Sequence, residues 1–310
     1  STICGWHTSL AESLRPLYCG MHIDLLKSEV IGTDDTPVKV QDRKKKQNIK
    51  RGHEWICIGD KNHPVNMFFY THGRGRDGPK RFLHGFTGYL LGDCFSGNRA
   101  LCAETGATFV ACLAHARRYF QKALPNNRPA AEEALRMFGE LFKIESDAKD
   151  WEISAEMVAR LRQEEAVPVL NKLKAWLDVQ VLSAVPKSSL GKAVSYCLNN
   201  WDFLNNYLLD GNARIDNNLS EQQMKKVAIG RKNWYFFGSD EGGEHASILL
   251  SVFSTALRHG LRPSEYICDV LQKLRKDRNC DIEPLLAHNW KANREKAEIE
   301  GFQATPQMAF

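Results

Sequence analysis

Three carboxylates in separate parts of the chain are the strongest candidates for chemistry. Asp34 lies in a run of β-branched residues, 30–40, where aspartate is normally depleted. Asp93 follows the apolar stretch 89–92, and Glu221 opens a helical pattern. Two aspartates on neighbouring strands and a later helical glutamate are the ligands that a two-metal phosphoryl-transfer site needs, because Mg²⁺ prefers carboxylate oxygens. The pattern therefore predicts Asp34, Asp93 and Glu221 as ligands of two Mg²⁺ or Mn²⁺ ions.

Each carboxylate also has a purely structural explanation. Strand alternation places Asp34 on the more apolar face and Asp35 on the opposite one, which makes Asp34 the more unusual of the two. The structural explanation for Asp34 is a solvated residue at a strand edge. Asp93 can initiate a turn, and Asn218 with Glu221 three residues later has the spacing of a capping box. Taken one residue at a time, these structural explanations are at least as plausible as a metal-binding role. Together the three residues favour a metal site, since clustered carboxylates repel one another without a cation.

The elements that must position these residues form an α/β pattern. Strands are predicted at 30–40, 55–58, 65–71, 88–93 and 108–113, with helices near 79–86 and 99–105. This order predicts a mixed five-stranded sheet flanked by helices, in which active sites gather at the carboxyl ends of strands.

The remaining chain reads as helical, apart from strand and loop signals at 230–239 and a loose tail. Further helices are predicted at 244–260 and 263–276. The sequence therefore predicts five parts, which are an N-terminal helical lead-in (1–28), the first part of the core (29–124), an all-α insertion (125–210), the second part of the core with Glu221 (211–276) and a C-terminal tail (277–310).

Composition excludes several classes of protein. The 310 residues carry 42 Lys and Arg against 37 Asp and Glu, a net charge of +5 that permits nucleic-acid binding. Nine cysteines without a C-x-x-C pair argue against a disulfide framework and favour the cytoplasm. The longest apolar stretch, 248–257, is too short to span a membrane. Residues 1–10 lack the pattern of a signal peptide, and the absence of an initial Met suggests part of a longer protein.

Basic segments are candidates for contacts with DNA phosphates. A turn at 43–51 holds six positive charges, and 231–237 mixes cations with aromatic residues. A solvated hairpin, an ordinary helix surface and, for the aromatic residues, a place in the core are the alternatives. The candidate DNA-binding residues are Arg43, Lys44, Lys45, Lys46, Arg117, Arg118, Lys225, Lys226, Arg231 and Lys232.

Six motifs then occur in order along the chain. They are Gly32-Thr33-Asp34-Asp35-Thr36-Pro37-Val38, Leu91-Gly92-Asp93-Cys94-Phe95-Ser96-Gly97, Ala114-His115-Ala116-Arg117-Arg118-Tyr119-Phe120, Asp216-Asn217-Asn218-Leu219-Ser220-Glu221, Ile229-Gly230-Arg231-Lys232-Asn233-Trp234 and Gly238-Ser239-Asp240-Glu241-Gly242-Gly243-Glu244. From residue 1 to about Trp290 the series closely resembles the DDE-type transposases of the insertion sequence 66 family.

The resemblance implies a ribonuclease H-like fold with Asp34, Asp93 and Glu221 as its acidic triad. It implies metal-dependent cleavage of DNA and transfer of the cut strand, acting on transposon terminal inverted repeats and target DNA. Cys112 and His115 resemble a C-x-x-H element of several DDE families, which makes His115 a possible supporting residue. A homo-oligomer on DNA, accessory proteins of the element and a bacterial, nucleoid-associated location are implied in the same way.

Some positions depart from the family pattern. Asp35 replaces a glutamate, and Gln222 to Lys226 replace a segment with arginines, which puts one phosphate contact in doubt. The family's N-terminal helix-turn-helix and zinc-binding elements have no counterpart in this chain. A catalytically silent DNA-binding protein and a nuclease that only hydrolyses are therefore the alternative functions. If Glu221 pointed away from the two aspartates, Glu241 or Glu244 would be the next candidates.

Overall fold

The computed structural model describes residues 2–44, 48–75 and 77–303. A five-stranded mixed sheet has the strand order β3-β2-β1-β4-β5, with β1 parallel to β4, β4 parallel to β5, and β2 antiparallel to β3. This confirms the predicted α/β class. The strands are β1 (Val30–Gln41), β2 (Ile49–Ile58), β3 (Asn66–Thr71), β4 (Tyr89–Gly92) and β5 (Thr108–Ala111).

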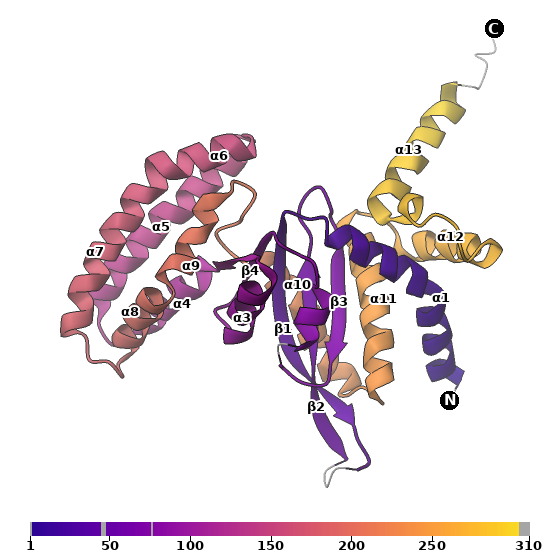
Figure 1. The fold of residues 1–310 in the computed structure, drawn as a ribbon, viewed down its shortest axis with the longest axis horizontal. Helices are drawn as coiled ribbons and strands as arrows, with labels where there is room; N and C mark the ends of the chain where they lie inside the picture. The colour runs from indigo at the N-terminus through magenta and orange to yellow at the C-terminus, as the bar shows by residue number, and fades with distance from the viewer. Residues whose placement is uncertain (1, 45–47, 76, 304–310) are drawn as a thin grey trace. The chain divides into compact units, whose positions relative to one another are not determined.

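The helices follow the predicted order with few exceptions (Figure 1). They are α1 (Thr2–Leu25), α2 (Asp77–Phe82), α3 (Ser96–Thr105), α4 (Leu113–Ala123), α5 (Arg128–Asp150), α6 (Ala155–Leu161), α7 (Val167–Ser183), α8 (Ser189–Asn199), α9 (Trp201–Asn205), α10 (Asn218–Trp234), α11 (Asp240–Arg258), α12 (Pro263–Lys276) and α13 (Ala287–Gln303). A π-helical turn, η1 (Arg162–Ala166), joins α6 to α7, and 3₁₀ turns form η2 (Asn206–Leu209) and η3 (Glu283–Leu285). In the described ranges no helix has the length and apolarity that crossing a bilayer requires.

The chain divides into two compact units, neither of which is continuous in sequence. One contains Ser1–Ser28, Asp35–Gly78 and Gln222–Phe310; the other contains Glu29–Asp34 and Pro79–Glu221. Strand β1 and helix α10 each contribute residues to both units. The second unit holds Asp34, Asp93 and Glu221 together with all the helices of the predicted insertion.

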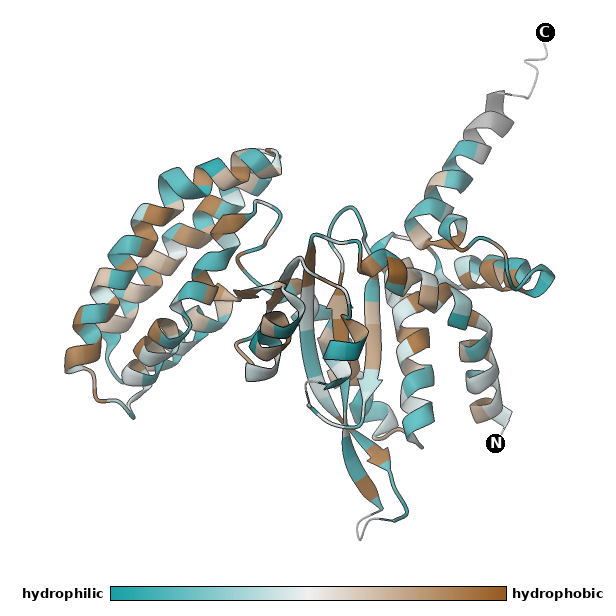
Figure 2. Ribbon diagram, in the orientation of Figure 1, coloured by the Kyte–Doolittle hydropathy of each residue, from teal (hydrophilic) through white to brown (hydrophobic). Residues whose placement is uncertain are grey.

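The segment 125–210 is helical throughout its regular structure, as the sequence predicted. Helix α4 packs against α5 and α8, and α7 packs against α5 and α8. Apolar residues recur on one side of these helices, and Figure 2 shows hydrophobic and hydrophilic positions interleaved along them. Pro168 does not break the helix but stands in the first turn of α7, directly after the π-helical turn η1.

In the other unit, α11 lies along β3, an edge strand of the sheet, and takes the place of a neighbouring strand on its open side. Ser251 Oγ accepts the Phe68 N–H at 2.7 Å, and Thr255 Oγ1 accepts the Asn66 N–H at 2.9 Å. The same hydroxyls donate back to the carbonyls of Phe68 (3.3 Å) and Asn66 (3.2 Å). Small hydroxyl residues at positions four apart on α11 therefore satisfy backbone groups of the outer strand.

Two predictions about the C-terminal third were wrong. Residues 230–234 continue α10 as helix, and of the predicted strand only Phe237 forms a β-bridge, with Val40. The tail is not loose over its whole length, because it contains α13 and docks on α12. Tyr266 Oη donates to the Leu285 carbonyl (2.7 Å), and Trp290 Nε1 donates to Asp269 Oδ2 (2.6 Å).

Candidate active site

Asp34 and Asp93 occupy equivalent positions on paired parallel strands. The register pairs Gly32 of β1 with Leu91 of β4, and each aspartate follows its paired residue by two positions. Neighbouring strands lie about 4.8 Å apart, so the two residues emerge side by side where β4 ends. Alternation also held, since Val38 and Val40, which share the face of Asp34, are buried.

The Asp93 carboxylate is oriented by the turn that leads into α3. Its Oδ1 accepts the Phe95 N–H at 3.2 Å and an Asn98 Nδ2 hydrogen at 3.3 Å. Asn98 is buried, and its amide also reaches the Asp93 carbonyl. The turn-initiating role that the sequence offered for Asp93 is thus real, and the same bonds fix the direction of the carboxylate.

Asn217 ties the start of α10 to the sheet. Its side-chain Nδ2 donates to the Thr33 carbonyl of β1 at 2.7 Å, and its backbone N–H donates to Cys112 Sγ at 3.2 Å. Its own carbonyl accepts the N–H of Glu221 in the first turn of α10. One buried residue therefore connects the Asp34 strand, the residue that begins α4 and the helix that carries Glu221.

Close approach of this segment to β1 explains the glycine at position 32. A Cβ atom on Gly32 would lie 2.7 Å from Ser220 Oγ and 3.1 Å from Asn217 Oδ1. Any side chain would push the Glu221 segment away from the strand, so backbone contact at Gly32 sets the distance between them.

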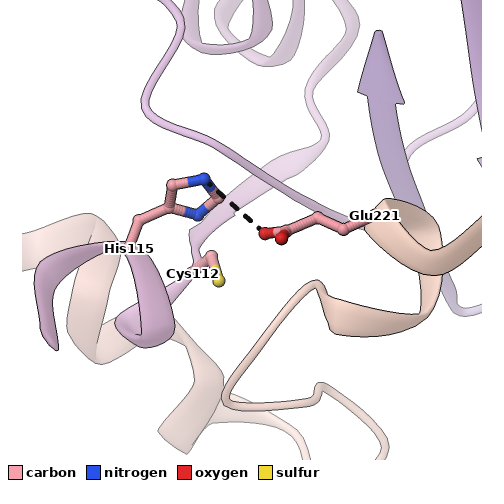
Figure 3. Close-up of side chains that lie close together, drawn as sticks. All are labelled: Cys112, His115 and Glu221. Carbon is pink, nitrogen blue, oxygen red and sulfur yellow. Dashed lines mark ion pairs between the residues drawn. The ribbon is translucent and has the colours of Figure 1, made fainter. Parts of the chain in front are cut away.

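The Glu221 side chain points toward α4 (Figure 3). Its Oε1 accepts a hydrogen bond from Arg118 at 2.5 Å and lies 3.6 Å from His115 Nε2. The sequence had offered a capping box with Asn218 as the alternative, but the Asn217 carbonyl accepts the Glu221 N–H and Oε1 is paired with a cation. Glu221 is therefore directed at side chains of another helix.

The charges of two candidate ligands, Asp93 and Glu221, affect the pKa of His115. Burial and the nearby Arg118 charge lower the pKa of His115, while the charges of Glu221 and Asp93 oppose that shift. The imidazole is therefore neutral at pH 7. Because Arg118 donates toward Nε2 at 3.3 Å, this nitrogen acts as the acceptor and the proton resides on Nδ1.

One group of three potential metal ligands stands out in the described part of the chain. Cys112 Sγ, a ring nitrogen of His115 and a carboxylate oxygen of Glu221 lie within 4.8 Å of one another. Asp34 and Asp93 are not members of this close group. The sequence paired Cys112 only with His115, as a C-x-x-H element; the fold adds a third potential ligand, Glu221.

Comparison with known proteins agrees with this architecture. The sequence model described as "Transposase IS66 family" matches residues 1–245, which is most of the chain and includes every candidate ligand. The chain belongs to the IS66 transposase family.

Two uncharacterized proteins of Sinorhizobium fredii (strain NBRC 101917 / NGR234) are similar to this IS66-family chain. Protein y4hP is 29% identical over 302 residues, covering 90% of the chain and 54% of its own length. Protein y4jD is 30% identical over 304 residues, covering 93% of the chain and 59% of its own length. The chain thus spans rather more than half the length of these IS66-family relatives.

The residue next to the first aspartate has partners of its own. The Asp35 side chain is covered by two of them, since Arg74 NH2 and His53 Nδ1 each lie 2.8 Å from its oxygens. Asp35 is therefore engaged in contacts within the other unit.

The predicted DNA-binding residues fall into several environments. Arg117 stacks over the Phe142 ring at 5.4 Å, and Arg118 pairs with Glu221 while remaining 43% exposed. Arg231 donates to Thr36 Oγ1 and the Pro37 carbonyl, fastening α10 to β1. The exposed members are Arg43, Lys44, Lys225, Lys226 and Lys232, and Lys45 and Lys46 lie outside the described residues.

The aromatic residues after Arg231 are more exposed than the sequence suggested. A place in the core was the alternative for them, but only Phe237 is buried, whereas Trp234, Tyr235 and Phe236 are exposed. Tyr235 has a φ of 61°, a left-handed conformation that costs energy for a residue with a side chain. The hollow beside it, of about 310 Å³, is lined by cationic and apolar residues, which are Pro37, Val38, Lys39, Arg51, Arg231 and Tyr235.

The supporting residues of the site carry little signal in the sequence. Asn217 and Gly32 lie inside the ordered motifs, but their contacts are with segments far away in sequence. Asn98 lies five residues after Asp93 and is otherwise unremarkable in the sequence. A glycine and two asparagines within five residues of the candidate ligands are the hint that the sequence offers.

Proposed function

We propose that this chain is the catalytic part of a DDE transposase, in which Asp34, Asp93 and Glu221 bind two Mg²⁺ or Mn²⁺ ions. One observation carries the proposal. Asp34 and Asp93 stand at equivalent positions of paired strands, and the charges of Asp93 and Glu221 converge on the same imidazole. Two ions about 4 Å apart can be shared by carboxylates that do not all meet at one point.

The residues present fit such ions. All three proposed ligands offer hard carboxylate oxygens, which suit Mg²⁺. The region also favours positive charge, since the Arg118 guanidinium lies 2.5 Å from Glu221 Oε1. Bound ions would supply activation of the attacking oxygen and charge neutralisation at the leaving oxygen.

The chain's own residues position the ligands and organise charge. The Phe95 N–H and Asn98 amide hold Asp93, and Asn217 with Gly32 sets Glu221 against the Asp34 strand. His115, neutral at pH 7, lies beside Glu221 with its Nε2 accepting the Arg118 hydrogen bond. Such phosphoryl transfers depend mainly on positioning and electrostatics, so little further acid–base chemistry is required.

The decisive experiment measures cleavage and end joining of labelled transposon-end DNA with Mg²⁺ or Mn²⁺. Asp93→Asn should lower the rate by roughly 10³-fold, because each tenfold corresponds to 1.36 kcal/mol and a metal ligand contributes several. Asp178→Asn, the same change at an exposed helical position, should retain wild-type activity.

Each outcome has a clear reading. Joined products lost in Asp93→Asn support transposition, whereas hydrolysis without joining supports a nuclease. Equal inactivity of wild type and Asp93→Asn with DNA binding intact, in a longer protein that includes the relatives' additional length, would point to a silent DNA-binding derivative.

We also propose that the basic and aromatic surface formed by Lys39, Arg51, Arg231, Trp234, Tyr235 and Phe236 binds DNA. Cations can follow the phosphate backbone while an exposed ring stacks on an unpaired base. The strained backbone of Tyr235 supports a functional role, since such strain concentrates where side chains are used.

Replacing Tyr235 with glycine tests this surface. The change removes the ring but suits a φ of 61°, so the protein should fold at least as stably as the wild type. Affinity for a labelled single-stranded oligonucleotide should fall by about 1–3 kcal/mol in binding free energy. Trp151→Ala, which removes another exposed ring, is the control. Unchanged affinity in Tyr235→Gly would show that the ring does not stack on DNA.

A further inference from the structure

The ligand group on α4 and α10 suggests a second kind of metal chemistry. We propose that Cys112, His115 and Glu221 form a binding site for a borderline transition-metal ion such as Zn²⁺ or Co²⁺, which shares only Glu221 with the proposed carboxylate site. These residues supply one sulfur, one nitrogen and one oxygen, a set that suits such ions and not Mg²⁺.

The observed spacing is close to what a single ion requires. Zinc bonds of about 2.0–2.3 Å in tetrahedral geometry place ligand atoms roughly 3.3–3.8 Å apart. His115 Nε2 and Glu221 Oε1 are already 3.6 Å apart, and all three ligand atoms lie within 4.8 Å. Small side-chain rotations would complete the set, with water as the fourth ligand, as in three-ligand zinc sites.

The position of Cys112 suits a metal ligand. Cys112 is the N-cap residue of α4, and Asn217 donates its N–H to Sγ at 3.2 Å. Burial raises the pKa of the Cys112 thiol to about 11, so the thiolate would form only with a bound cation. His115 follows three residues later, so one turn presents both side chains together. The thiol proton would pass to solvent when the ion binds, because a coordinating thiol is deprotonated.

Arg118 marks the position that a cation would take. A single guanidinium nitrogen, NH2, lies 2.5 Å from Glu221 Oε1 and 3.3 Å from His115 Nε2. An ion binding these two atoms would replace that N–H group. Arg118 is 43% exposed, so it can turn toward solvent without burying its charge.

Sharing of Glu221 links this site to catalysis, a consequence that rests on the proposed function. An ion held by Cys112, His115 and Glu221 would withdraw Glu221 from Asp34 and Asp93. The two binding modes would therefore compete, and a transition-metal ion would act as an inhibitor that Mg²⁺ displaces at high concentration.

Cobalt absorption tests the site without DNA or activity. Titrating the metal-stripped 310-residue chain with Co²⁺ should produce a thiolate-to-metal band in the near ultraviolet and the intense visible bands of tetrahedral Co²⁺, and Zn²⁺ should abolish both. Cys112→Ser should lose the thiolate band, and His115→Ala should weaken Co²⁺ binding at least tenfold. Cys4→Ser, at an exposed cysteine, and Asp93→Asn should keep the band. Arg118→Ala should bind Co²⁺ more tightly.

Other results would overturn the proposal. A thiolate band that persists in Cys112→Ser would assign Co²⁺ to other cysteines, and binding lost in Asp93→Asn but retained in Cys112→Ser would leave only the carboxylate site. Circular dichroism of each variant separates lost binding from lost folding. If the site is present but Mg²⁺ does not compete in wild type, the cobalt site stands and the shared role of Glu221 fails.

Discussion

Replacing Arg162 with methionine should lower the free energy of unfolding of the helical insertion by about 3–5 kcal/mol. The Arg162 side chain is only 2% exposed, and its guanidinium forms a double hydrogen bond with Glu145 at 2.8 and 2.7 Å. Removing it would leave a largely buried carboxylate without its partner, which costs more than the pair itself contributes.

Arg162 also holds the end of the insertion. Its NH1 donates to the carbonyls of Tyr207 (2.6 Å) and Asp210 (2.7 Å), and its charge lies 4.9 Å from the centre of the Tyr207 ring. Loss of these bonds should therefore loosen η2 and the loop that precedes Asn217.

Hydrogen exchange across residues 128–210 would measure the effect directly. Arg162→Lys should recover little, since lysine cannot form the paired bonds of a guanidinium. Arg162→Met with Glu145→Leu should recover part of the loss, because no unpaired charge remains. A loss below about 1 kcal/mol in Arg162→Met would contradict this account of the buried pair.

Replacing Glu54 with glutamine should remove a strong pH dependence of stability. Glu54 in β2 is fully buried, and burial raises its pKa to about 8, against the opposing effect of a hydrogen bond from Ser247. The unfolded chain releases the proton near pH 4.5. The stability that the neutral Glu54 carboxyl contributes to the folded protein is thus fully present below pH 4.5 and is lost as the pH rises toward 8.

The expected loss is about 3 kcal/mol between pH 4.5 and 7, from 1.36 kcal/mol per pH unit. Glu54→Gln stays uncharged, so its stability should not fall over this range and should exceed that of the wild type at pH 8. Urea unfolding at pH 5 and pH 8 would show the difference, with Glu265→Gln as an exposed control in the same unit. Parallel pH profiles of wild type and Glu54→Gln would show that Glu54 does not titrate as described.

Local patterns explain why much of the fold could be predicted. Strand alternation in β1 placed Asp34 with Val38 and Val40, and helical spacing over 1–28 predicted the helix that is α1. Both patterns depend only on the period of one element, which the sequence carries directly.

Contacts over long sequence separations could not be predicted in the same way. The bond between Arg118 and Glu221 joins residues 103 positions apart, and nothing in either segment identifies the other. The segment 230–239 carries strand signals in its sequence, but only Phe237 forms a β-bridge, with Val40. The residues before it, up to Trp234, are helical. The candidate ligands could therefore be named from the sequence, but their partners could not.

The hydroxyl face of α11 has a consequence for how this chain avoids aggregation. An uncovered edge strand can pair with the same strand of another molecule, and β3 is such an edge until Ser251 and Thr255 occupy its backbone groups. Because α11 lies far downstream of β3, a nascent or truncated chain that lacks α11 exposes the unpaired backbone groups of β3. They are covered once α11 has been synthesised. Completion of this helix is thus a safeguard against self-association as well as a packing element.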